Sequence, residues 1–232
     1  MENMKAVRVH NYGGPEVLRF EDAPRPTPGS GELLIRVHAA SVNPIDWKVR
    51  AGYMKDYIPL PLPFIPGWDV SGVVEAAGGV GGFAVQLAKW KGAYVIGTAS
   101  TRNQAFLRQL GVDEPIDYEK TRFEDVVHDV DVVLDPIGGE TQKRSWKTLK
   151  KGGILVSIVG PPSAEEAKNH GVHSAYLSAQ GGSSLLAELA TLVDSGKIKP
   201  TVETVLPLSE ARHAHELNET GHARGKIVLK VA

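Results

Sequence analysis

The chain of 232 residues has no cysteine, few aromatic residues and a formal net charge of only −1. Without thiols it cannot contain a disulfide framework, a cysteine nucleophile or a zinc site built on thiolates. The near-zero net charge gives no electrostatic basis for binding nucleic acid or an anionic membrane. No apolar run approaches about 18 residues, and the first residues lack the basic and apolar regions of a secretory signal. We therefore expect a soluble, cytoplasmic protein that binds neither nucleic acid nor membranes.

The composition is that of an ordinary globular protein, with 42% hydrophobic and 23% charged residues. Residues 5–10 and 33–39 alternate apolar and polar side chains, as β-strands do. Prolines crowd the loop between these strands and a later loop, and proline cannot donate a ladder hydrogen bond. The sequence up to Glu75 therefore predicts a small β-rich domain with many turns.

From Gly78 onward, predicted strands alternate with predicted helices. The helices are residues 102–110, 140–150 and 183–195, and the strands are residues 94–98, 131–135 and 154–159, with a short strand near Ile116. Such alternation is typical of βαβ units. It predicts an α/β fold with a doubly wound parallel sheet of the Rossmann type, whose ligands bind at the carboxyl ends of the strands. We expect a last helix from the N-cap Ser209 to Thr220, followed by a strand over residues 226–231.

A glycine-rich motif, A-A-G-G-V-G-G-F-A, occupies residues 76–84. Gly79, Gly81 and Ala84 fit the G-x-G-x-x-G/A fingerprint, whose bare backbone lets a pyrophosphate approach the start of a helix. Apolar residues at helical spacing follow, Gly92 can close that helix, and a strand comes next. The expected pyrophosphate contacts are Gly78, Gly79, Val80 and Gly81. The alternative is an ordinary flexible turn before a helix.

The residues after that strand favour NADPH over NADH. A carboxylate about 20 residues past the glycines usually binds the ribose hydroxyls of NAD. No Asp or Glu occurs between Glu75 and Asp113, and Ser100 and Arg102 stand at that place instead. A hydroxyl beside a guanidinium can hold a 2′-phosphate through charge-assisted hydrogen bonds. The alternative is that Arg102 lies on a solvated helical turn.

Several motifs along the chain match one family in that family's order. They read N-Y-G-G-P-E-V-L, A-S-V-N-P-I-D-W-K-V-R-A-G, P-F-I-P-G-W-D-V-S-G-V-V-E-A, A-A-G-G-V-G, D-V-V-L-D-P-I-G-G-E, L-K-K-G-G-I-L-V-S-I-V-G and G-K-I-V-L. With them the chain resembles the zinc-independent quinone oxidoreductases of the medium-chain dehydrogenase/reductase superfamily, the group of zeta-crystallin and the 2-alkenal and enone reductases. The resemblance implies a partial GroES-like catalytic domain over residues 1–76, to which residues 206–232 return. It also implies an NADPH-binding Rossmann domain over residues 77–205.

The chain departs from that family between Ala76 and Ala77. Family members carry a long segment there, with the rest of the catalytic domain and the first strand of the nucleotide-binding sheet. A deletion, a splice variant and an omitted stretch of sequence are the three explanations. We favour an omitted stretch, because a sheet without its first strand would expose two unpaired edges.

The resemblance also implies a catalytic set without a metal. Asn43 is expected near the nicotinamide and the acceptor, and Asp46 supports the same loop. Lys48 could stabilise an enolate or hydroquinone anion, and Tyr53 could donate a hydrogen bond there. Zinc alcohol dehydrogenases of the superfamily carry a zinc-binding histidine at the position of Trp68, which cannot bind zinc. The alternatives are a simple turn at Asn43 and a solvated surface lysine at Lys48.

The resemblance also implies cofactor contacts at Tyr118, at the adenosine end, and at Gly225 and Lys226 on the returning C-terminal segment. The contacts expected at the nicotinamide half follow two predicted strands, and they are Ile137, Gly138, Val159 and Gly160. Two histidine pairs look like metal ligands but do not predict a site. His170 and His173 fall in a predicted polar loop, whereas His213 and His215 point to different sides of a helix.

These expectations describe an NADPH-dependent oxidoreductase that transfers hydride to a quinone or an α,β-unsaturated carbonyl (an enal or enone), as a homodimer. The competing hypothesis is an NADPH-binding protein without significant turnover, either a redox sensor or a crystallin-like structural protein. Cofactor binding without acceptor-dependent oxidation of NADPH would select the second hypothesis. The sequence does not distinguish quinones from enals and enones.

Overall fold

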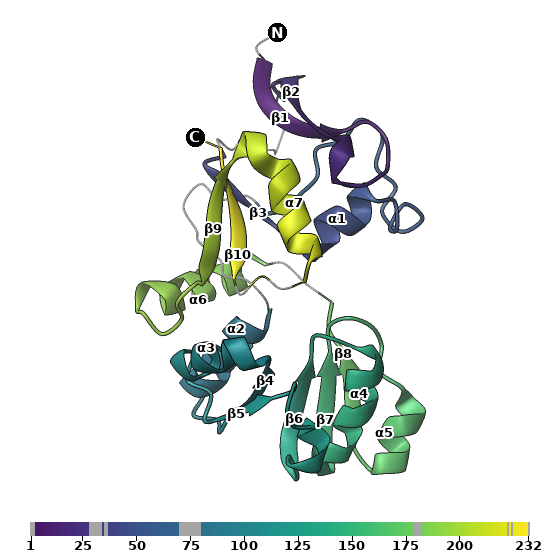
Figure 1. The fold of residues 1–232 in the computed structure, drawn as a ribbon, viewed down its shortest axis with the longest axis vertical. Coiled ribbons are helices and arrows are strands. Elements are labelled where there is room, and N and C mark those ends of the chain that lie inside the picture. The colour runs from purple at the N-terminus through teal and green to yellow at the C-terminus, as the bar shows by residue number, and fades with distance from the viewer. Residues whose placement is uncertain are drawn as a thin grey trace. The chain divides into compact units, whose positions relative to one another are not determined.

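The computed structural model divides the chain into two compact units. The first comprises Met1–Gly82 and Lys199–Ala232, and the second comprises Phe83–Ile198. Figure 1 shows the order of their elements along the chain. The structure describes residues 3–27, 34, 37–69, 80–178, 182–221, 223 and 225–231.

The first unit contains two small sheets. β1 (Asn3–Val9) pairs antiparallel with β2 (Leu18–Pro24). In the second sheet, β10 (Lys226–Lys230) lies between β3 (Ala39–Val42), to which it is antiparallel, and β9 (Val202–Pro207), to which it is parallel. The second sheet therefore joins an early strand of the chain to its last strand (Figure 1).

The register of β3 against β10 brings two distant residues together. Val42 lies opposite Ile227 in this antiparallel ladder. Strands in a sheet lie about 4.8 Å apart, so the residues just beyond this pair, Asn43 and Lys226, become neighbours. A contact across 183 positions of sequence thus follows from one strand pairing.

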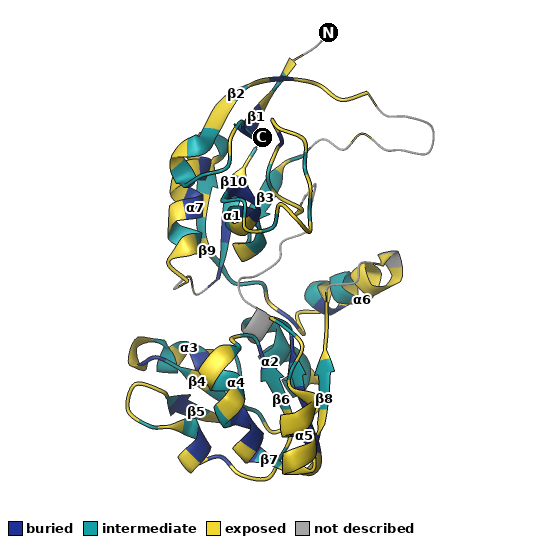
Figure 2. Ribbon diagram, turned by 90° about the vertical axis from the view of Figure 1, so that its right-hand side faces the viewer, coloured by how far each residue is buried: buried dark blue, intermediate teal, exposed yellow. Residues whose placement is uncertain are grey.

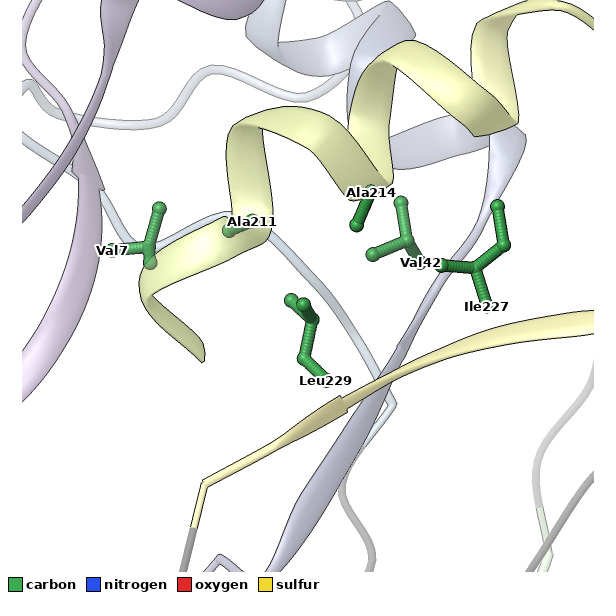
Figure 3. Close-up of a cluster of buried hydrophobic side chains, with 6 residues drawn as sticks. All are labelled: Val7, Val42, Ala211, Ala214, Ile227 and Leu229. Carbon is green, nitrogen blue, oxygen red and sulfur yellow. The ribbon is translucent and has the colours of Figure 1, made fainter. Parts of the chain in front are cut away.

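Helix α7 (Ala211–Glu219) packs on this sheet through its small side chains. Figure 3 shows Ala211 and Ala214 of α7 in one buried cluster with Val42, Ile227 and Leu229. The two alanines are three positions apart and therefore share one helix face. The opposite face of α7 is exposed (Figure 2). Apolar burial between α7 and β10 thus fixes the strand that carries Lys226.

A buried arginine ties α7 to α1 (Pro44–Arg50). Arg50 donates from Nε to the carbonyl of Gly13 over 3.1 Å and from Nη1 to Nδ1 of His215 over 3.2 Å, and Nη2 pairs with Glu219. Arginine can only donate, so Nδ1 of His215 must be unprotonated. Burial, and then the charge of Arg50, lowers the pKa of His215 to about 4.

The second unit alternates helices with parallel strands, which confirms the predicted α/β fold class. Its strands are β4 (Ile96–Ala99), β5 (Glu114–Asp117), β6 (Val130–Asp135), β7 (Leu149–Ser157) and β8 (His173–Tyr176). Its helices are α3 (Gln104–Gln109), α4 (Gly139–Ser145), α5 (Ala164–His170), α6 (Ser183–Asp194) and most of α2 (Val80–Trp90). Gly92 ends α2 with φ 82°, as expected for a left-handed cap. Among the described ranges, no helix is long and apolar enough to cross a bilayer.

The parallel strands described in the second unit form two separate sheets, β4-β5 and β6-β7-β8. The usual doubly wound order is 3-2-1-4-5-6, in which the first strand lies between the second and the fourth. If β4 to β8 are the second to sixth strands, the two sheets are the pairs 3-2 and 4-5-6. The described strands then lack only the first one. This is the strand that the family resemblance places in the absent segment; Val70–Gly79, just before α2, lie outside the described residues.

Several predicted boundaries are wrong, and the strand predicted over 154–159 already begins at Leu149. The helix predicted over 140–150 ends at Ser145 and passes into a 3-10 turn, because Leu149 already pairs with Val130 in the sheet. Ser209 is not an N-cap but lies inside the 3-10 turn Leu208–Glu210. The ladder of β9 with β10 runs up to Pro207, and the helical turn begins as soon as that ladder ends. The predicted strand 33–39 falls largely outside the described residues, and β3 begins at Ala39.

The polar loop predicted around His170 is instead the end of helix α5. Ser163 is its N-cap, and the Ser163 hydroxyl accepts the N–H of Glu166 over 3.2 Å. A serine followed three residues later by glutamate is a recognised start signal for a helix. His170 thus ends α5, and His173 begins β8.

Acid should destabilise the first unit through His215. The unfolded imidazole takes up a proton near pH 6.5 and the folded one only near pH 4, so between these values the unfolded state binds more protons. His215 should therefore lower the free energy of unfolding by up to about 1.4 kcal/mol per pH unit as the pH drops through this window, whereas buried Asp46, whose pKa is raised to about 6, acts in the opposite direction. Urea unfolding at several pH values measures this slope.

A matched pair of variants isolates the effect. His215→Asn keeps an acceptor for Arg50 but cannot titrate, so its stability should fall less than that of the original chain as the pH drops. His213→Asn alters an exposed histidine of the same helix and should keep the original slope. Identical slopes for all three proteins would contradict the role given to His215.

Candidate active site

Asn43 lies between β3 and α1, and other residues hold both ends of its amide. Nδ2 donates to Oδ2 of Asp69 over 2.6 Å, and Oδ1 accepts a hydrogen bond from the Lys226 ammonium. That ammonium is 3.9 Å from the Asp69 carboxylate. The hydroxyl of Ser41 donates to the same carboxylate. A carboxylate, an amide and an ammonium thus form one connected polar chain, which we call the Asp69–Asn43–Lys226 chain.

Asp46 supports this chain from the first turn of α1. Its Oδ2 accepts the backbone N–H of Asn43 over 2.7 Å. The residue is only 2% exposed, and its Oδ1 has no hydrogen-bond partner among the described residues. Burial raises the pKa of Asp46 to about 6, and the nearby charge of Asp69 acts in the same direction. The Asp46 carboxyl group is therefore buried away from water and fixes the backbone of Asn43 through this hydrogen bond.

Lys48 and Tyr53 both contact Trp47. The Lys48 ammonium is 5.7 Å from the centroid of the Trp47 ring, and the Tyr53 ring packs edge-on against that ring at 6.1 Å. Lys48 is exposed, and Tyr53 is 71% exposed. In the part of the chain that the structure describes, no hydrogen bond links either side chain to Asn43. Their catalytic roles stay predictions.

Buried Asp135 at the end of β6 organises the expected nicotinamide edge. Its carboxylate accepts the N–H of Ile137 over 3.1 Å, the N–H of Gly138 over 2.8 Å and Nε2 of Gln142 over 2.7 Å. Burial opposes ionisation, but these hydrogen bonds outweigh it and hold the pKa of Asp135 below its ordinary value. The turn after β6 is therefore fixed by one buried charge.

This turn brings together residues that the sequence placed at two separate strand ends. Gly138 has φ 78°, and a Cβ there would lie 2.9 Å from Cγ2 of Val159, so a larger residue would push the two ends apart. Ile137 and Val159 remain 69% and 51% exposed at the carboxyl ends of adjacent strands. With Gly160 behind them, they offer an apolar surface of the kind that a nicotinamide ring requires.

The expected adenosine end lies where β4 and β5 finish side by side. Ser100 follows β4 and is buried, whereas Arg102 and Tyr118 are exposed. Ala99 and Asp117 are partners in the parallel ladder, so these residues share one end of the sheet. Hydroxyls, a guanidinium and an exposed aromatic ring fit the adenosine and phosphate groups of a dinucleotide.

Two carboxylates at this end were missed by the sequence argument. Glu119 accepts the N–H of Thr101 over 3.0 Å, and Asp117 accepts the Thr101 hydroxyl over 2.6 Å. Both follow Asp113 and so lie beyond the place, about 20 residues past the glycines, where a ribose-binding carboxylate is expected. The parallel pairing of β5 with β4 brings later carboxylates to the same place. The edge therefore combines two acidic side chains with the exposed cations of Arg102 and Lys120, and Lys120 pairs with Asp117 over 3.1 Å.

The other expected cofactor contacts are the glycine-rich motif at the start of α2 and Gly225 before β10. Gly78 and Gly79 lie outside the described residues, and Val80 and Gly81 begin α2. A Cβ on Gly225 would lie 2.4 Å from the carbonyl oxygen of Thr201, so close backbone packing by itself requires this glycine. Among the residues described, no group of three or more His, Cys, Asp or Glu could hold a metal ion.

Replacing Asp135 tests whether one carboxylate holds the turn after β6. Asp135→Asn keeps the shape but removes the charge that accepts three N–H groups, so we expect a loss of about 2 kcal/mol in the free energy of unfolding. The control, Asp131→Asn on the same strand, removes an exposed ion pair with Lys150 and should cost about 0.5 kcal/mol or less. Urea unfolding of both variants measures the difference, and equal losses would contradict the assignment.

Comparison with known proteins places both units in one family. The zinc-binding dehydrogenase family matches residues 110–229, and the alcohol dehydrogenase GroES-like domain matches residues 29–106. A chloroplastic NADPH-dependent alkenal/one oxidoreductase of Arabidopsis thaliana is 28% identical, with 98% of this chain and 80% of that protein covered. That alignment runs over 321 positions, more than the 232 residues of this chain, so the relative carries residues that this chain lacks.

Solved structures agree with the family match. A quinone oxidoreductase from Coxiella burnetii superimposes with a TM-score of 0.84 at 31% identity, and all of both chains is covered. A mycobacterial protein complexed with NADPH superimposes with a TM-score of 0.81 at 26% identity, covering 98% of this chain and 99% of that one. The chain belongs to the zinc-binding dehydrogenase family, and through it to the medium-chain dehydrogenase/reductase superfamily of oxidoreductases.

Proposed function

We propose that the chain is an NADPH-dependent reductase that transfers hydride to a quinone or an α,β-unsaturated carbonyl without a catalytic metal. The observation that carries this proposal is the Asp69–Asn43–Lys226 chain, which joins an ammonium to the amide of Asn43, the residue expected near the acceptor. The Arabidopsis relative is named for NADPH and alkenals or alkenones, and the Coxiella structure for quinones. These names support the proposed cofactor and the proposed classes of acceptor.

The reaction needs orientation more than it needs acid–base groups. Bound NADPH supplies the hydride. Ser100, Arg102 and Tyr118 would hold its adenosine and phosphate end, and Ile137 and Val159 would keep water from the nicotinamide ring. Hydroxyls and a guanidinium suit a phosphate, whereas apolar side chains suit a ring that must stay dry.

The acceptor side depends on the first unit. An amide nitrogen carries two hydrogens, and Asp69 takes only one from Asn43. The other can therefore donate to an acceptor carbonyl and orient it. We assign the cofactor to residues 77–205 and the acceptor to residues 1–76 with 206–232. A homodimer and a cytoplasmic location belong to the same proposal.

One observation favours a second candidate function. Relatives carry residues that this chain lacks, and the family resemblance places part of the catalytic domain among them. A chain without that part could bind NADPH and turn over no acceptor. It would then act as a redox sensor or a structural protein.

A spectrophotometric screen on protein of verified intact mass separates the two functions. Oxidation of NADPH that depends on an added quinone or alkenal supports the reductase. Binding of NADPH without oxidation supports the second candidate, and failure to bind NADPH contradicts both. The intact mass shows whether the protein contains only the 232 residues.

Arg102 should determine the preference for NADPH. Arg102→Gln removes the exposed cation beside Ser100, so the Kd for NADPH should rise about tenfold while the Kd for NADH stays the same. Arg108→Gln removes an exposed guanidinium from the far end of α3 and serves as the control. Fluorescence titration measures both constants. Equal weakening of NADPH and NADH would show that Arg102 does not contact the 2′-phosphate.

A further inference from the structure

We propose that Lys226 stabilises the negative charge that forms on the acceptor oxygen, and that Asp69 positions Lys226 by acting through Asn43. This inference rests on the proposed function, because it names the residues that act in that reaction. It gives Lys226 a role toward the acceptor, whereas the family resemblance gave it a contact with the cofactor.

Two-electron reduction of either acceptor leaves charge on oxygen. The hydride and its electron pair leave the dihydronicotinamide, which is oxidised. A quinone then becomes a hydroquinone monoanion, and an enone becomes an enolate once its C=C electron pair shifts toward the carbonyl. One proton from water completes the product. A hydrogen-bond donor aimed at that oxygen lowers the barrier because the charge develops in the transition state.

Lys226 is the cation placed for this task. Its side chain is 18% exposed, so the ammonium is largely withdrawn from water yet still reachable. An ammonium has three donors, and Asn43 accepts one of them. The Asp69 carboxylate, at 3.9 Å, lies beyond hydrogen-bond distance from it. The described residues offer this ammonium no other acceptor, so donors on Lys226 remain for a ligand, whereas exposed Lys48 stands over the Trp47 ring.

Asp69 fixes the amide that holds Lys226. An ionised carboxylate can only accept, so the NH₂ group of Asn43 must face Asp69 and its oxygen must face Lys226. Ser41 donates to the same carboxylate and helps to hold it in place. Without the carboxylate, the amide could rotate and present its NH₂ group to the ammonium, which accepts nothing. Loss of Asp69 would therefore displace Lys226 without removing any atom of it.

Because carboxyl groups surround Lys226, its effect on an acceptor oxygen depends on the direction of its N–H donors. Asp46 and Asp69 both lie near the single charge of Lys226, so the cluster carries no excess positive charge. The summed electrostatic field of these three groups would therefore not stabilise an oxyanion. An oriented N–H donor would act over hydrogen-bond distance and depends on the Asn43 contact.

Lys226→Gln tests the role in turnover. Removing one donor to an oxyanion commonly costs about 100-fold in kcat, and we expect a loss of that size with the Kd for NADPH nearly unchanged. Lys230→Gln removes an exposed ammonium from the other end of β10 and should leave both quantities unaltered. A weaker Kd for NADPH with unchanged kcat would overturn the proposal and return Lys226 to the cofactor.

A phenol titration tests the same site without turnover. 4-Nitrophenol is a spectroscopic probe whose phenolate resembles the hydroquinone monoanion, and a nearby ammonium should lower the pKa of the bound phenol. The original chain and Lys230→Gln should show this lowered value, and Lys226→Gln should not. Equal values in all three proteins, or no binding to the original chain, would overturn the proposal.

Two variants of Asp69 test its positioning role. Asp69→Ala should lose most of the kcat and the phenol shift, whereas Asp69→Asn can still offer an oxygen to Asn43 and should retain much of both. Circular dichroism establishes that each variant is folded. Equal behaviour of folded Asp69→Ala and the original chain would refute the positioning role. If the original chain oxidises no NADPH but Lys226→Gln abolishes its phenol shift, only the proposed function fails.

Discussion

The candidate active site depends on the antiparallel pairing of β3 with β10. This pairing puts Val42 opposite Ile227 and so makes neighbours of Asn43 and Lys226. The small residues of α7 pack against the same two strands, so apolar burial keeps the ladder in register (Figure 3). A one-residue slip would reverse the faces of β10 and expose its buried side chains. The hydrophobic core and the polar chain are therefore fixed by the same register.

The described part of the second unit shows a different constraint, because one strand of a doubly wound sheet is not among its strands. Its described parallel strands form two sheets whose order fits a doubly wound sheet without its first member. The strand ends that would hold a dinucleotide are nevertheless fixed by interactions within each of the two sheets. Asp135 fixes the turn after β6, and the ladder of β4 with β5 gathers Ser100, Arg102 and Tyr118. Each half can therefore keep its part of a cofactor surface by local interactions.

The sequence predicted the fold class well because hydrophobic periodicity and glycine stops are local signals. It also proposed Asn43, Asp46 and Lys226, but only through family resemblance and for separate roles. Their contact depends on strand register, which no local pattern specifies. Asp69 was passed over because its neighbour Trp68 served only to exclude zinc. The carboxylates of Asp117 and Glu119 were missed because a rule based on distance along the chain does not include residues that a parallel neighbouring strand brings to the same place.

The central claim is that this chain transfers a hydride from the nicotinamide to an electron-poor acceptor. The most direct measurement mixes the complex of protein and NADPH with a quinone or alkenal and follows the first turnover, using NADPH with and without deuterium at C4. We expect acceptor-dependent oxidation that is slower with the deuterated cofactor, because the transferred bond breaks in that step. The same rate with both cofactors, or no oxidation with either acceptor class, would contradict the claim.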